Sequence, residues 1–162
     1  MAEKFAAAGM SLFGYGSLME LVHFLQRQEI QKALIVTDAS INKLGLLKPV
    51  QEALKEGGAE CIVFDGVMPN PTLENVNDGV KLMTDNGCDA IVAVGGGSAN
   101  DCAKAIRILE ANGGELRDYM GGIRPKKKGK YLIAVNTTAG TGSEVSRAFL
   151  ISDEKEKRKL IF

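Results

Sequence analysis

Residues 90–98 read AIVAVGGGS, five apolar residues followed by three glycines and a serine, and a helical pattern follows them. The apolar run predicts a strand buried on both faces, as in a parallel sheet. Glycines let a backbone turn tightly and let a ligand approach closely, while a helix start offers unpaired N–H groups. Residues 95–98 therefore predict a strand-to-helix turn suited to a pyrophosphate. The third glycine of the usual dinucleotide fingerprint is missing, so a plain tight turn is the alternative.

Similar apolar runs and helical stripes alternate along the rest of the chain. Further buried strands are predicted at residues 33–37, 61–64 and 131–135. Apolar residues at helical spacing predict helices at residues 18–25, 47–54, 73–83 and 102–109,. Ser17 and Glu20 have the form of a capping box for the first of them. The alternation predicts an α/β fold, a Rossmann-like, doubly wound, mostly parallel sheet built from βαβ units.

The last part of the chain has a different pattern. Apolar residues 148–151 and 160–162 flank the charged stretch 153–159, which predicts a terminal β-hairpin with a solvated turn. The second strand is apolar up to the last residue, so its apolar surface is expected to promote self-association. A domain rarely ends on an apolar strand without a cap, so we expect residues 1–162 to be a fragment of a longer chain.

Composition excludes several classes of protein. Lys plus Arg and Asp plus Glu are both 20, a net charge of 0, which argues against a general nucleic-acid binder. No apolar run approaches the roughly 20 residues needed to span a bilayer. The three cysteines are far apart and form no Cys-x-x-Cys pair, so a disulfide framework and a zinc site are both disfavoured. We expect a cytoplasmic protein with no membrane or nucleic-acid partner.

A second glycine turn, Gly14-Tyr15-Gly16, competes with residues 95–98 for the phosphate role. It also precedes a helix, and Asp38 ends a strand 22 residues after Gly16, the spacing of the acid that binds ribose hydroxyls. With either turn, a carboxylate at Asp38 would bind the adenine ribose and repel a 2′-phosphate, which favours NAD over NADP. As an alternative, Asp38 is a helix N-cap or a turn residue.

Hydroxyl groups gather near the same predicted sheet edge. Ser98 is expected to cap the helix after the glycines and to donate to a phosphate, with Asp101 completing a cap-like pattern. Residues 136–144, which follow the last strand, contain four hydroxyl side chains and two glycines. They predict a donor-rich loop for a nucleotide, or an ST-turn and helix cap in which Thr141 and Glu144 form the box.

Four segments in this order resemble the iron-containing (group III) alcohol dehydrogenases. They are Asp38-Ala39, residues 65–72 (DGVMPNPT), residues 95–104 and residues 137–144 (TTAGTGSE). The resemblance begins at about Phe13 and implies that residues 95–98 hold the pyrophosphate, leaving the Gly14–Gly16 turn structural. It implies NAD-contacting positions at Asp38, Asn70, Gly95, Gly96, Gly97, Ser98, Asp101, Thr137, Thr138, Thr141, Ser146 and Lys159. Ala148 is smaller than the residue usual at its position in the family.

The resemblance also implies a missing part: residues 1–162 would form one dinucleotide-binding domain, a fragment of a longer two-domain enzyme. In the family, a helical C-terminal domain supplies one aspartate and three histidines to divalent iron or zinc, whereas this chain has a single histidine, His23, expected at the surface. We therefore expect no catalytic and no metal-binding residue in this chain, and no activity from it alone.

The longer enzyme is expected to transfer hydride between a primary alcohol or aldehyde and NAD, as a homo-oligomer. The alternatives are an inert nucleotide-binding or self-associating module, or a relative of glycerol dehydrogenase or dehydroquinate synthase.

Overall fold

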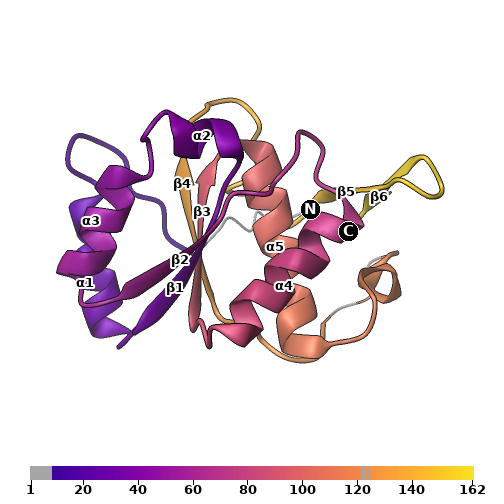
Figure 1. Cartoon of the computed structure of the whole chain (residues 1–162), viewed down its shortest axis with the longest axis horizontal. Helices are drawn as coiled ribbons and strands as arrows, with labels where there is room; N and C mark the ends of the chain where they lie inside the picture. Colours follow the sequence, from indigo (N-terminus) through magenta and orange to yellow (C-terminus); the bar gives the residue numbers. More distant parts are fainter. Residues whose placement is uncertain (1–8, 122, 124) are drawn as a thin grey trace, which may run out of the picture.

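The computed structural model describes residues 9–121, 123 and 125–162, and it places helices on both faces of a parallel sheet (Figure 1). The sheet strands are β1 (Lys32–Val36), β2 (Glu60–Phe64), β3 (Ala90–Gly95) and β4 (Tyr131–Asn136). Their order is β2-β1-β3-β4, and each neighbouring pair is parallel. The direction of winding reverses between β1 and β3, which confirms the predicted doubly wound α/β sheet.

The strands differ in burial according to their place in the sheet. Every residue of β3 is buried, as are four of the five residues of β1. The edge strands β2 and β4 have no buried residue. The prediction of full burial is thus correct for the two central strands and wrong for the two edge strands. An edge strand has a neighbouring strand on one side only, so its residues can stay partly exposed even when they are apolar. The apolar composition of a strand therefore does not tell whether it lies at the edge.

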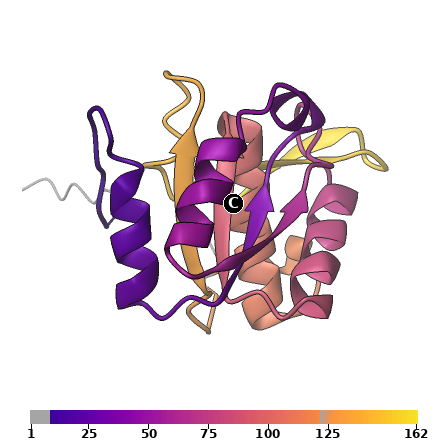
Figure 2. The ribbon, with the colours of Figure 1, turned by 60° about the vertical axis from the view of Figure 1, so that its left-hand side comes forward.

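Two pairs of helices cover the sheet (Figure 2). They are α1 (Met19–Arg27) with α3 (Lys48–Glu56), and α4 (Leu73–Asp85) with α5 (Gly97–Asn112). Ile91 and Ala93 of β3 pack with α4 and α5, whereas Val92 and Val94 pack with α1 and α3. This alternation builds one hydrophobic core on each face. All four helices predicted from apolar spacing are confirmed, while this spacing did not predict the short α2 (Ala39–Lys43) or the 3₁₀ helix η1 (Leu116–Tyr119).

The helix caps differ from those predicted. The N-cap of α1 is Leu18, and no side chain caps this helix. The predicted capping box is therefore wrong, and Glu20 N meets Ser17 only through the backbone carbonyl, at 3.2 Å. A capping box does form at α4, where Thr72 Oγ1 accepts from Asn75 N at 3.2 Å and Asn75 Oδ1 accepts from Thr72 N at 3.3 Å.

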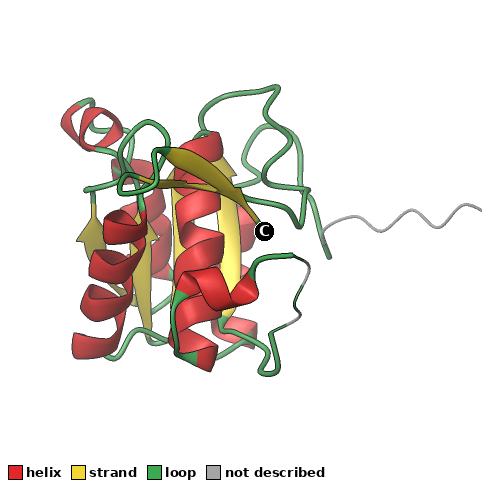
Figure 3. Cartoon of the chain, turned by 90° about the vertical axis from the view of Figure 1, so that its right-hand side faces the viewer, coloured by secondary structure: helices red, strands yellow, loops and turns green. Residues whose placement is uncertain are grey.

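The predicted terminal hairpin is confirmed as the antiparallel pair β5 (Leu150–Asp153) and β6 (Arg158–Ile161). It lies across the helices α4 and α5 (Figure 3) and is anchored where Ser152 N donates to Pro71 O at 2.7 Å. The apolar end is only partly exposed: Leu160 is buried, Phe162 stacks on Phe149, and Ile161 is 65% exposed. In the described ranges, no helix is long and apolar enough to cross a membrane.

Candidate functional site

The turn between β3 and α5 leaves the start of a helix uncapped. Gly96 is the N-cap of α5 and has no side chain to accept from the first N–H groups. Ser98 lies inside the first turn of the helix, so the prediction that Ser98 caps it is wrong. Because β1 and β3 meet at the reversal of strand order, this helix start faces the place where open α/β sheets bind ligands.

The glycines of this turn allow a second loop, residues 137–148, to approach closely. Gly95 has a φ of +152°, which L side chains rarely adopt. A Cβ added at Gly96 would lie 2.7 Å from Thr138 Oγ1, and one at Gly97 would lie 3.3 Å from Thr141 Cβ. The structure therefore brings Thr138 and Thr141 against the glycine turn.

Two more of the predicted positions lie at the start of this second loop and near its end. Thr137 N donates to Gly95 O at 3.0 Å, which joins the end of β4 to the turn. Ser146 Oγ accepts from Ala148 N at 3.0 Å, so this hydroxyl stabilises a local turn. Thr137 thus adjoins the glycines, whereas the contacts of Ser146 are within its own turn.

Asp101 fastens this loop and the hairpin to α5 instead of contributing to a cap. Its Oδ1 accepts from Ser143 Oγ at 2.5 Å, and its Oδ2 accepts from Leu150 N at 3.0 Å. Lys104 Nζ donates to Ser143 Oγ at 2.9 Å and lies 3.7 Å from Asp101 Oδ1. Burial lowers the pKa of Lys104, and the carboxylate of Asp101 opposes that shift. The sequence indicated Ser143 as one of the hydroxyls of residues 136–144 but not its contact with Asp101, which forms only when the loop folds against α5.

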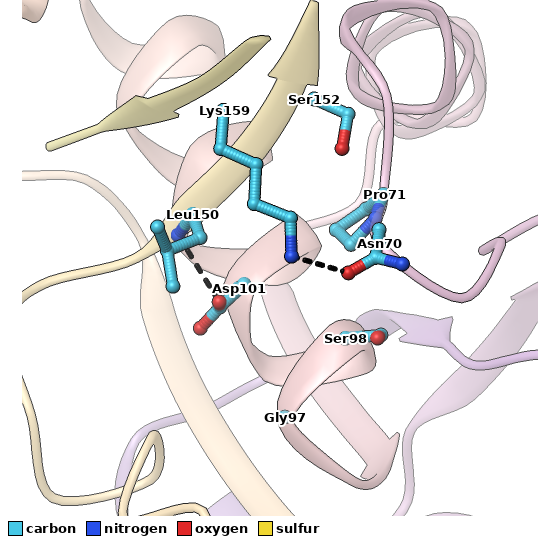
Figure 4. A pocket seen from close by; sticks show the side chains of 8 residues that line it. All are labelled: Asn70, Pro71, Gly97, Ser98, Asp101, Leu150, Ser152 and Lys159. Carbon is cyan, nitrogen blue, oxygen red and sulfur yellow. Dashed lines mark hydrogen bonds between the residues drawn. The ribbon is translucent and has the colours of Figure 1, made fainter.

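A pocket of about 180 Å³ lies between the start of α5, the loop before α4 and the hairpin (Figure 4). Lys159 Nζ donates to Asn70 Oδ1 at 2.7 Å across it. Asn70 has a φ of +59°, a left-handed conformation that asparagine tolerates better than most residues,. The pocket is lined by Asn70, Pro71, Gly97, Ser98, Asp101, Leu150, Ser152 and Lys159. The structure therefore gathers five of the predicted site residues around one cavity.

Asp38 lies outside this pocket, at the end of β1. It is the N-cap of α2, where its Oδ1 accepts from Ser40 N at 2.8 Å and from Ile41 N at 3.1 Å. The N-cap alternative for Asp38 is confirmed, and the ribose contact stays a prediction. In the described part of the chain Asp38 Oδ2 has no hydrogen-bond donor, so one carboxylate oxygen remains for a ligand.

The two remaining local predictions have mixed outcomes. Thr141 Oγ1 accepts from Ser143 N at 3.3 Å, which confirms an ST-turn, but residues 142–146 form no helix, so the Thr141–Glu144 box is wrong. The Gly14–Gly16 turn precedes α1 and follows residues 9–13, which form no strand. It therefore lacks the strand-to-helix setting of the turn after β3.

The described residues do not fit a metal centre. Between residues 9 and 162, leaving out the two undescribed positions 122 and 124, no group of three His, Cys, Asp or Glu side chains could hold an ion. His23 is exposed on α1. Burial raises the pKa of Cys102 to about 12, which disfavours the thiolate form that binds metals,.

Comparisons of the sequence and of the structure with known proteins point to one family. The family of iron-containing alcohol dehydrogenases matches residues 9–162. Alcohol dehydrogenase 4 of Saccharomyces cerevisiae is 44% identical over 93% of this chain and 40% of its own length. A 1,3-propanediol oxidoreductase structure superposes with a TM-score of 0.93 and 36% identity, over 99% of this chain and 42% of its own.

A second solved structure contains a nucleotide. It is the complex of sulfoacetaldehyde reductase from Bifidobacterium kashiwanohense with NAD+, which has a TM-score of 0.88 and 28% identity. The match covers 100% of this chain and 43% of that one. This chain thus spans about two fifths of the length of the relatives that it matches.

Proposed function

The chain belongs to the family of iron-containing alcohol dehydrogenases, and from this premise we propose that it is the NAD-binding part of an enzyme that transfers hydride between a primary alcohol or aldehyde and NAD. One observation carries the proposal: the uncapped start of α5, with its glycine turn, faces the reversal point of the sheet. An anion is stabilised there by unpaired N–H groups and by the helix dipole.

In this proposal the pyrophosphate of NAD lies on the first turn of α5. Gly96 supports it because any larger residue would meet Thr138 Oγ1, 2.7 Å from the added Cβ. The Ser98 hydroxyl donates to a phosphate oxygen, and Lys159 supplies a positive charge beside it. Gly95, Gly97 and Thr141 complete the wall around the phosphates.

The adenosine end extends from the pyrophosphate toward β1. There the second carboxylate oxygen of Asp38 accepts from the ribose, and Thr137 with Thr138 lines the adenine side. Asn70 adjoins the nucleotide from the loop before α4, and Asp101 acts mainly through the loop and hairpin that it holds. Ser146 supports the end of the 137–148 loop.

The bound nicotinamide would accept or release the hydride, while the residues of this chain bind and orient the cofactor. Within the described ranges no group of side chains is suited to bind a metal ion, whereas the family is an iron-containing one. In this proposal, divalent iron or zinc and the alcohol-binding groups therefore belong to a helical C-terminal domain. The 162-residue chain alone is accordingly expected to be inactive, and the whole enzyme is proposed to be a homo-oligomer.

Titration calorimetry with NAD+ tests the binding function directly. We expect one NAD+ per chain and displacement of that NAD+ by ADP, because the pyrophosphate contacts are shared. Absence of NAD+ binding to a chain that is folded by circular dichroism would contradict the proposal. A parallel assay with a primary alcohol, NAD+ and added ferrous iron should form no NADH, and NADH formation would contradict the assignment of the metal site elsewhere.

A further inference from the structure

We infer that Asp65, held by Asn42, is a second determinant of the choice between NAD and NADP, acting beside Asp38. This inference rests on the proposed NAD site. It concerns a side chain that neither the glycine turn nor the pocket contains. Asp65 directly follows β2, and its carboxylate is exposed.

The ends of β1 and β2 bring the two aspartates to the same edge of the sheet. The strands pair in parallel up to Val36 and Phe64. Beyond the strands, Thr37 N donates to Phe64 O at 2.9 Å and Val67 N donates to Thr37 O at 3.2 Å. An isolated bridge then pairs Asp38 with Gly66, the residue after Asp65.

The short helix α2 holds both carboxylates. Its first N–H groups are used by Asp38 Oδ1, and Asn42 N donates to Asp38 O at 3.2 Å. On the same turn of the helix, Asn42 Nδ2 donates to Asp65 Oδ2 at 2.7 Å. Each carboxylate therefore accepts a hydrogen bond from a donor of α2, which orients it at this edge of the sheet.

This arrangement acts against a phosphate on the ribose 2′ position. The 2′-hydroxyl of NAD can donate to the open oxygen of Asp38. A 2′-phosphate would instead meet the negative charges of Asp38 and Asp65. It would also find the N–H groups at the start of α2 and the amide of Asn42 already engaged. Replacing Asp38 alone leaves one of these two charges in place.

The test compares NAD+ and NADP+ affinities by calorimetry for the wild type, Asp65→Asn, Asp38→Ala, the double variant and the control Asp78→Asn. Asp78 is an exposed aspartate of α4, so its replacement changes the net charge equally. For Asp65→Asn we expect NADP+ to bind about tenfold more tightly, the effect of one unit charge near a phosphate at an exposed surface. NAD+ affinity should be unchanged, and the double variant should favour NADP+ more than either single variant.

A further variant, Asn42→Ala, tests whether the position of the carboxylate matters. It releases Asp65 without removing its charge, so NADP+ affinity should rise, but by less than in Asp65→Asn. The inference is overturned if Asp65→Asn binds NADP+ as weakly as the wild type while NAD+ still binds. It is also overturned if Asp78→Asn gives the same gain. Loss of NAD+ binding in the folded wild type would instead remove the proposed function, and with it the premise.

Discussion

Two strand-to-helix turns lie side by side at the carboxyl edge of this sheet, and they are built in opposite ways. After β1, Asp38 caps α2 and uses the N–H groups of Ser40 and Ile41. After β3, Gly96 precedes α5 and leaves its first N–H groups without a side-chain cap. The two turns occupy equivalent places in the topology, on either side of the point where the strand order reverses.

The difference shows how two turns at one edge of a sheet can suit two different chemical groups. A capped helix start satisfies its own donors and presents a carboxylate, which suits a hydroxyl group. An uncapped helix start presents donors and a positive dipole end, which suits an anion. A dinucleotide carries both groups, so the contrast between the turns fits the pyrophosphate and the adenine ribose of the proposed NAD.

The largest effect is expected from filling the uncapped turn. Gly96→Val would place side-chain atoms where Thr138 Oγ1 lies, 2.7 Å from the added Cβ, and would push the second loop away. We expect NAD+ affinity to fall at least about 100-fold, the equivalent of two charge-assisted hydrogen bonds. Calorimetric titration measures the NAD+ affinity of this variant. The control is Gly9→Ala, where an added Cβ meets no atom within 4 Å. Undiminished binding by Gly96→Val would show that the pyrophosphate lies elsewhere.

The capped turn should respond to Asp38→Ala in two ways. Loss of the N-cap should lower the free energy of unfolding by about 1 kcal/mol. Loss of the ribose contact should weaken NAD+ by about tenfold, the value of one hydrogen bond to a charged group. Thermal unfolding and calorimetry separate the two effects. Asp38→Asn keeps a good capping residue, so it should retain the stability while the preference for NAD+ over NADP+ falls, with the part that Asp65 contributes left in place.

Lys159 of the hairpin lines the pocket at the uncapped turn together with Gly97 and Ser98, and in the proposed function it supplies a positive charge to a phosphate there. We expect Lys159→Met to weaken NAD+ about fivefold at low salt, because a partly exposed charge near a phosphate contributes about 1 kcal/mol. The loss should shrink as salt is added, since salt screens exposed charges. Lys155→Met, on the exposed turn of the same hairpin, is the matched control. Equal losses from both variants would contradict a specific contact of Lys159.

The sheet and the helices that cover it could be predicted because buried strands and helices leave regular patterns of apolar residues in the sequence. Apolar runs and helical stripes located the four sheet strands and the helices α1, α3, α4 and α5, and glycines after residue 112 correctly ended α5. The five-residue α2 was indicated only by the N-cap alternative for Asp38, because it is too short for an apolar stripe and has no buried residue. The capping errors at Ser17 and Ser98 have one cause: a cap depends on where a helix begins to within one residue, which spacing does not determine.

The site was predictable only in part, for a different physical reason. Local patterns located the glycine turn and Asp38, which are contiguous with the strands that present them, and the family resemblance favoured this turn over Gly14–Gly16. Asp101, Ser143 and Leu150 come from three segments, and their hydrogen bonds exist only after the loop and hairpin fold over α5. Asn42 and Asp65 are likewise 23 residues apart in the chain. Contacts of this kind have no local pattern in sequence.

The smallest effect is expected from Ser98→Ala, and it separates the two turns most sharply. Ser98 was expected from sequence to be a cap, but it lies inside α5 and caps nothing. Its removal should therefore leave the melting temperature unchanged, unlike the removal of Asp38. NAD+ affinity should fall only about threefold, since a water molecule can replace the hydroxyl as a donor to the phosphate. A clear drop in stability would mean that Ser98 supports the helix after all. No change in affinity would mean that the N–H groups of the turn, and not its hydroxyl, hold the phosphate.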